Sequence, residues 1–151
     1  MSIILFIAHA PSPNTAQLRD QSVARITADA DVTLITQSPF DCGLDDVMNA
    51  DGIIIGTTEN IGAMAGATKD FFDRTYNDLL EVKAGLPVAA YIRAGLDGTG
   101  TTRGLESIIT GLRWRLIAPP LVLKGPWQDR FSEDAAELAL TLAAGVEMNI
   151  Y

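Results

Sequence analysis

Short apolar runs alternate along the chain with longer segments in which apolar residues recur every three or four positions. The short runs predict buried strands, and the periodic segments predict amphipathic helices. The expected strands cover residues 2–9, 31–36, 51–57, 86–93 and 119–124. The expected helices cover residues 14–28, 45–49, 63–80, 101–116 and 132–148. Regular alternation of strand and helix is typical of α/β proteins, in which helices cover both faces of a parallel sheet.

The pattern shows no internal repeat, no low-complexity tract and no linker rich in Gly, Ser or Pro. A length of 151 residues is sufficient to bury one substantial hydrophobic core. We therefore expect a single domain over residues 1–151.

The net charge of the chain limits which kinds of partner it can bind. The chain has 19 acidic and 11 basic residues, for a formal net charge of −8 at pH 7. An acidic surface repels phosphate backbones, so nucleic acid is a poor partner for the bulk of the molecule. The simplest interpretation of this charge is that it keeps the protein soluble.

Two residue types are scarce. Cys42 is the single cysteine and His9 the single histidine, so we expect neither an intrachain disulfide framework nor a metal site. No run of about 18 apolar residues is present, and we expect no membrane span. The apolar residues 1–9 lack the basic start and cleavage site of a signal peptide. We expect a cytoplasmic protein.

Open α/β sheets bind ligands beyond the carboxyl ends of their strands, where loops lead into helix N-termini. The first such loop runs from His9 to Thr15. Its free backbone N–H groups and the positive end of the helix dipole favour a phosphate. The candidate phosphate-binding residues are His9, Ser12, Pro13, Asn14 and Thr15. The alternative is that Ser12 or Asn14 only caps the helix.

The segment Gly56-Thr-Thr-Glu-Asn-Ile-Gly-Ala-Met-Ala-Gly-Ala-Thr-Lys-Asp-Phe-Phe-Asp-Arg-Thr75 follows a buried strand and leads into a helix. It resembles the second flavin-binding loop of the flavodoxin-like superfamily, which includes flavodoxins, NADPH-dependent FMN reductases and related quinone reductases. The matching positions are Thr57, Glu59, Gly62, Met64, Gly66, Lys69, Phe72, Asp73 and Arg74. The loop from His9 to Thr15 is also similar to the Ser/Thr-rich flavodoxin motif that ends in Asn-Thr, although Pro11 and Pro13 depart from it.

The resemblance implies a three-layer flavodoxin-like fold, with a five-stranded parallel sheet in the order 2-1-3-4-5 and a ligand site where β-strands one and three meet. It implies FMN as the cofactor, with NAD(P)H as a possible electron donor. The isoalloxazine would contact the second loop, through residues Thr57, Thr58, Glu59, Asn60, Ile61, Gly62 and Ala63. Met64, Phe71 and Phe72 are assigned to core packing.

The third loop follows the fourth strand and is rich in glycine. Its residues Gly95, Leu96, Asp97 and Gly98 are candidates for contact with the pyrimidine edge of the flavin, because glycine lets the backbone approach closely. Arg93 and Arg103 are positive charges near this loop that could attract an NADPH phosphate. We favour the simpler interpretation that both arginines are solvated.

Three functions remain open, and the oxidoreductase among them needs no separate set of catalytic residues, because the flavin carries the chemistry. The first is an NAD(P)H-dependent oxidoreductase that reduces a quinone, a flavin or a similar acceptor. The second is a flavodoxin-type electron carrier, and the third is a flavodoxin-fold binding module that has lost FMN. The expected partners are a small-molecule or protein redox partner, and a homo-oligomer is possible. A phosphoacceptor receiver domain is rejected, since His9-Ala10 and Thr57 stand where its acidic residues belong.

Overall fold

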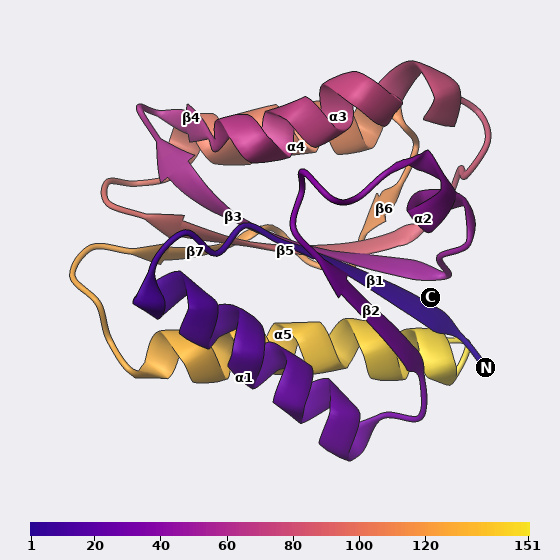
Figure 1. The fold of residues 1–151 in the computed structure, drawn as a ribbon, viewed down its shortest axis with the longest axis horizontal. Helices are drawn as coiled ribbons and strands as arrows, with labels where there is room; N and C mark the ends of the chain where they lie inside the picture. The colour runs from indigo at the N-terminus through magenta and orange to yellow at the C-terminus, as the bar shows by residue number, and fades with distance from the viewer.

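The computed structural model describes residues 1–151, and a twisted sheet runs through its centre (Figure 1). The parallel strands follow the order β2-β1-β3-β5, and two short strands, β6 and β7, both pair with the outer edge of β5. The strands are β1 Ile3–Ala8, β2 Thr33–Gln37, β3 Gly52–Asn60, β4 Ala63–Met64, β5 Pro87–Ala94, β6 Arg115–Leu116 and β7 Leu121–Lys124. The predicted order of the five parallel positions is confirmed.

Helices cover both faces of the sheet (Figure 1). One face carries α1 Pro13–Asp29 and α5 Arg130–Glu147, which pack side by side. The other carries α3 Gly66–Leu79 and α4 Thr99–Gly111, and the short α2 Leu44–Met48 lies against α3. The predicted three-layer α/β architecture is therefore confirmed.

The centre of the sheet is buried on both faces. Ile53 and Ile55 of β3 belong to the core under α3 and α4, whereas Ile54 belongs to the core under α1 and α5. All three are at most 1% exposed. A strand covered on both faces reads as a continuous apolar run, which explains why this strand was clear in the sequence. The predicted core positions Met64, Phe71 and Phe72 are also buried.

The fifth strand was predicted as one segment over residues 119–124, but it is divided into β6 and β7. The helix expected over residues 101–116 ends at Gly111, because Arg113 takes a positive φ of 58° and turns the chain back to the sheet. Arg115 then donates its backbone N–H to the Leu86 carbonyl at 2.8 Å and starts β6. The strand resumes as β7 only after Pro119 and Pro120, which lack the N–H needed for a sheet hydrogen bond.

The segment predicted as a loop over residues 57–63 is mostly strand. β3 continues to Asn60 and pairs antiparallel with β4, with Glu59 opposite Met64 and Asn60 opposite Ala63. Ile61 and Gly62 form the turn between them, and α3 begins at Gly66 rather than at Ala63. None of the helices is long and apolar enough to cross a membrane.

Candidate functional site

The carboxyl ends of β1, β3 and β5 surround a hollow of about 300 Å³. It lies on the face of the sheet that carries α1, since Thr58 and Arg93 alternate with the side chains buried under α3. Its lining residues come from all three predicted loops and are Pro11, Ser12, Asn14, Thr15, Thr58, Asn60, Arg93, Ala94 and Gly95. Three segments far apart in the sequence thus meet at the N-terminus of α1.

The hydroxyl groups of the first loop are occupied in capping α1. Ser12 is the N-cap, and its Oγ accepts the Thr15 N–H at 3.2 Å. In return the Thr15 Oγ1 accepts the Ser12 N–H at 2.9 Å and donates to the Ser12 carbonyl at 3.0 Å. Such reciprocal bonds form a capping box. Thr15 is buried, and its hydroxyl is occupied by bonds to Ser12. Of the two expected N-cap candidates, Ser12 and Asn14, Ser12 caps the helix.

Few backbone donors remain for an anion at this helix N-terminus. Pro11 and Pro13 have no N–H, and the His9 N–H donates to the Gly56 carbonyl at 2.9 Å. The N–H groups of Ala10 and Asn14 make no hydrogen bond within the chain. Asn14 is exposed, and its side chain also lacks a partner, so it offers both a backbone and a side-chain donor to the hollow.

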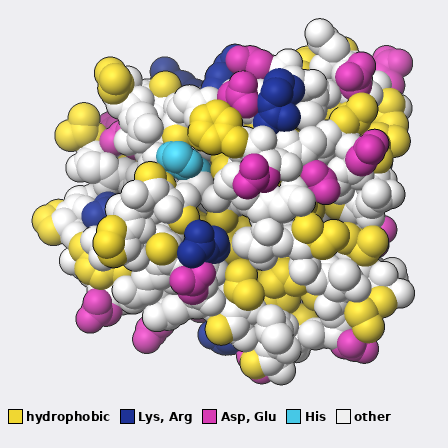
Figure 2. All heavy atoms as spheres, in the orientation of Figure 1, with side chains coloured by type: hydrophobic (Ala, Val, Ile, Leu, Met, Phe, Trp, Pro, Cys, Tyr) yellow, Lys and Arg dark blue, Asp and Glu magenta, His cyan; other side chains and the backbone are white.

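His9 stands at the head of this loop but does not line the hollow. Its imidazole makes no hydrogen bond and is visible at the surface in Figure 2. Partial burial lowers the pKa of His9 below its ordinary value, because desolvation disfavours the charged imidazolium.

The side chains of β3 divide between the two faces of the sheet. The Thr57 hydroxyl is buried and exchanges a hydrogen bond of 2.8 Å with Thr68 of α3, so it faces away from the hollow. Thr58 points the other way, and its Oγ1 donates to the Asn60 Oδ1 at 2.7 Å. Only Thr58 and Asn60 of this strand therefore line the hollow.

The turn that follows is conformationally strained. Ile61 has a φ of 51° and Gly62 a φ of 76°, the two positive values that a type I′ hairpin turn requires. Glycine adopts this conformation freely, but for a β-branched residue it is an outlier. The Ile61 side chain is 106% exposed and packs against nothing. A strained, exposed apolar residue thus occupies the tip of the hairpin.

Glu59 connects this hairpin to the third loop through two hydrogen bonds. Its carboxylate oxygens accept the backbone N–H of Leu96 at 2.9 Å and of Gly98 at 2.8 Å. Gly98 is the N-cap of α4 and has a φ of 70°, so the carboxylate also lies at the positive end of that helix. Two amides predicted to face the flavin are instead held by Glu59 in this structure.

The rest of the third loop is short and exposed. Gly95 lines the hollow, and the Leu96 side chain is 75% exposed. Asp97 accepts the Thr99 N–H at 3.0 Å, a bond that lowers the pKa of the Asp97 carboxyl. In the next turn a Cβ at Gly100 would overlap the Gly62 carbonyl oxygen, so only glycine lets α4 pack against the hairpin.

Arg93 was interpreted as a solvated arginine, and the structure contradicts this. Its Nη1 donates to the carbonyls of Ala94 at 2.9 Å and Leu123 at 3.0 Å. The guanidinium carbon lies 5.1 Å from the ring centre of Phe131 and 5.8 Å from that of Trp127. Arg93 is partly buried and lines the hollow. The sequence signal was only its place at the end of a strand, whereas Arg103 is exposed as expected.

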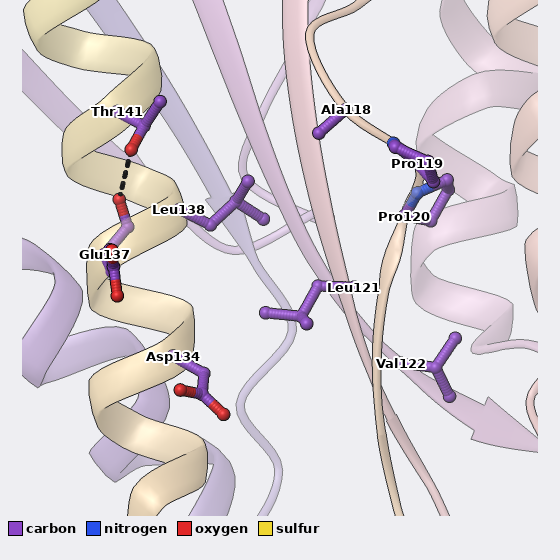
Figure 3. Close-up of a pocket in the computed structure, with 9 residues that line it drawn as sticks. All are labelled: Ala118, Pro119, Pro120, Leu121, Val122, Asp134, Glu137, Leu138 and Thr141. Atoms are coloured by element: carbon purple, nitrogen blue, oxygen red, sulfur yellow. Dashed lines mark hydrogen bonds between the residues drawn. The ribbon is translucent and has the colours of Figure 1, made fainter.

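A larger hollow, of about 450 Å³, lies on the outer edge of the sheet between β7 and α5 (Figure 3). Leu121 and Leu138 point into it from the two sides, and the Thr141 hydroxyl turns back to the Glu137 carbonyl at 2.8 Å. No helix N-terminus opens into this groove. Its lining is poor in groups that would bind a phosphate, so the smaller hollow at α1 is the better candidate site.

Solved structures share this architecture. A flavodoxin from the domain Archaea superposes with a TM-score of 0.74 at 18% identity, over 96% of this chain and 97% of that one. An azoreductase from Bacillus anthracis gives 0.73 at 13% identity, over 94% and 100%. A rubredoxin:oxygen oxidoreductase from Desulfovibrio gigas gives 0.76 at 15% identity, over 99% of this chain but 37% of that one. At these identities the likeness establishes the flavodoxin-like fold.

The sequence itself identifies the family. No curated protein sequence shows a significant match. The profile of the NADPH-dependent FMN reductase family, however, matches residues 13–129, which is more than half of the chain. The matched region begins at the first turn of α1 and includes the β3–β4 hairpin, the third loop and Arg93. The chain therefore belongs to the NADPH-dependent FMN reductase family, whose members are flavin-binding oxidoreductases with FMN as their cofactor.

Proposed function

We propose that this protein is an oxidoreductase that holds FMN at the hollow beside α1 and uses NAD(P)H to reduce a small acceptor, such as a quinone or a free flavin. The observation that carries the proposal is the convergence of the α1 N-terminus, β3 and β5 on this one hollow. Its volume of about 300 Å³ is at the lower end of the range for small-molecule sites.

The residues present fit the phosphate and the ribityl chain of FMN. The free N–H groups of Ala10 and Asn14 lie at the positive end of α1, where anions bind. The hydroxyls of Ser12 and Thr15 are hydrogen-bonded to each other and to the helix cap, so they hold the loop in shape rather than donate to the phosphate. Thr58 and Asn60 add polar atoms from β3 and suit the ribityl hydroxyls.

We assign the isoalloxazine to the hairpin tip and the third loop, with Ile61, Gly62 and Ala63 on one side and Gly95, Leu96 and Asp97 on the other. Thr57 and Gly98 act indirectly, by fixing the backbone of the two loops, because the Thr57 side chain is buried and the Gly98 N–H is held by Glu59. None of these residues is aromatic. A ring without a stacked aromatic stays accessible to a nicotinamide or an acceptor, which favours an enzyme.

When bound, FMN would supply the redox chemistry, taking two electrons from a reduced nicotinamide and passing them to the acceptor. The chain itself would orient the cofactor and fix the loops around it. Glu59 is the clearest example, because its carboxylate joins the β3 hairpin to the third loop.

A flavodoxin-type electron carrier is the second candidate, and the net charge of −8 favours it because an acidic surface steers basic protein partners. A binding module without FMN is the third. It is favoured by the Glu59 contacts, which hold two of the amides that a flavin would otherwise meet.

Absorption and rapid kinetics separate the three. The purified protein, supplied with equal amounts of FMN and FAD and then desalted, should retain flavin absorbance, and mass spectrometry of the heat-released cofactor should give FMN rather than FAD. In anaerobic stopped-flow measurements NADPH or NADH should bleach the flavin within seconds, and a quinone should restore the colour. Retained flavin that neither nicotinamide bleaches would support the carrier. Protein that binds no flavin would support the module.

A further inference from the structure

We propose that Arg93 supplies the positive charge of the phosphate site and thereby selects FMN over riboflavin. The inference rests on the proposed function, in that it concerns the same hollow beside α1. It assigns the charge to a residue of β5, outside the loop that precedes α1.

The first loop is short of hydrogen-bond donors for a phosphate. Pro11 and Pro13 lack an N–H, and the N–H groups of Ser12 and Thr15 are occupied in the capping box. Two free amides, at Ala10 and Asn14, remain for a phosphate with three oxygen acceptors and a charge between −1.5 and −2 near pH 7. The loop therefore needs a donor from elsewhere in the fold.

Arg93 is held in place while most of its hydrogen-bond donors stay free. A guanidinium has five N–H groups in a rigid fork. The two on Nη1 donate to the carbonyls of Ala94 and Leu123. Those on Nε and Nη2 have no acceptor within the chain, and the rings of Phe131 and Trp127 lie against the guanidinium. An arginine held in this way loses little entropy on binding an anion.

Arg93 has no counter-ion within the chain. The chain has eight more acidic than basic residues, and five of its arginines and lysines form ion pairs with carboxylates. Arg93, although partly buried, has no carboxylate within 4.0 Å. A partly desolvated cation without a partner attracts an anion more strongly than a solvated one does. Since Arg93 lines the hollow at α1, that anion is the phosphate.

The test compares the affinities of FMN and riboflavin, which differ only in the phosphate. Arg93→Met keeps the apolar packing against Phe131 and removes the charge. We expect it to weaken FMN binding about tenfold or more, to leave riboflavin binding unchanged and to reduce the salt dependence of FMN binding. Arg93→Lys should restore part of the salt-dependent preference for FMN. Arg103→Met removes the same charge from an exposed position and should change neither affinity.

Arg93 also joins β5 to β7, so a structural role must be distinguished from a ligand role. If Arg93→Met weakened FMN and riboflavin equally, or left both unchanged, the assignment would be overturned. Titration of the wild-type apoprotein with inorganic phosphate, followed by NMR at the Arg93 Nε–H and the Asn14 amide, needs no flavin. Saturable shifts at both groups in a protein that binds no flavin would refute the proposed function but support the assignment. The absence of shifts at Arg93 would contradict it.

Discussion

The strain at the hairpin tip can be tested by its effect on the stability of the apoprotein. Ile61 holds a φ of 51° with its side chain fully exposed. An L-residue in the left-handed region costs roughly 1–2 kcal/mol, whereas Asn tolerates it through local hydrogen bonds. Asn-Gly is also the preferred pair for a type I′ turn. Because Ile61 buries no surface, Ile61→Asn should remove the strain without loss of packing and stabilise the apoprotein by about 1 kcal/mol.

For a domain of this size, 1 kcal/mol corresponds to a rise in Tm of about 2–4 °C. Thermal unfolding followed by circular dichroism, with urea titration as a second measure, would detect it. Ile61→Val keeps the β-branch and should give no gain. Gly62→Val introduces a second β-branched residue at a φ of 76° and should destabilise the apoprotein, although space around it is open. A Tm for Ile61→Asn at or below that of the wild type would refute the account of the turn.

Three further predictions concern the surrounding contacts. Thr15→Ala removes the two hydrogen bonds from the Thr15 Oγ1 to the Ser12 backbone and should cost about 1 kcal/mol of unfolding free energy; an unchanged Tm in the apoprotein would contradict the role of the capping box. Glu59→Gln removes the negative charge and leaves one side-chain oxygen to accept the two backbone amides, so hydrogen exchange at Leu96 and Gly98 should accelerate. Unchanged protection at both amides would contradict the contact with Glu59. The pKa of His9 is lowered on folding, so the unfolded chain binds the proton more tightly and stability should fall as the pH drops below about 6.5. His9→Gln should lose that part of the pH dependence of stability. A profile of stability against pH identical to that of the wild type would contradict the role of His9.

The sequence predicted the sheet well because its signals are local and strong. Ile53, Ile54 and Ile55 form an apolar run that is typical of a strand buried on both faces. The alternation with helical periods then leaves few topologies, since parallel strands need crossovers of one hand. The resemblance of the segment after β3 to flavodoxin-like proteins selected the strand order that the structure shows.

The elements that were predicted wrongly depend on distant partners. Residues Arg115 and Leu116 continue the helical period of α4, but hydrogen bonds to β5 turn them into β6. Ile61 is a β-branched residue, and nothing local predicts that it takes a positive φ in a hairpin turn. The bounds of α4 and of the second loop therefore required the structure.

The site was predicted in outline because the carboxyl ends of neighbouring parallel strands must converge. Its chemistry was harder to predict. Whether Thr15 binds a ligand or caps a helix depends on side-chain geometry. Arg93 of β5 is held by the Leu123 carbonyl, 30 residues away in sequence, and by Phe131 of α5. Such long-range contacts cannot be predicted from the local sequence pattern.

The central claim is that the phosphate of FMN binds at the N-terminus of α1, and an FMN titration of two charge variants tests it most directly. Asn14→Asp places a carboxylate in the hollow, yet an acidic residue in the first turn favours the helix. Gln21→Glu adds the same charge two turns further along α1. We predict that Asn14→Asp weakens FMN binding at least tenfold with no loss of Tm, and that Gln21→Glu binds FMN like the wild type. Equal FMN affinities for the two variants would contradict the claim.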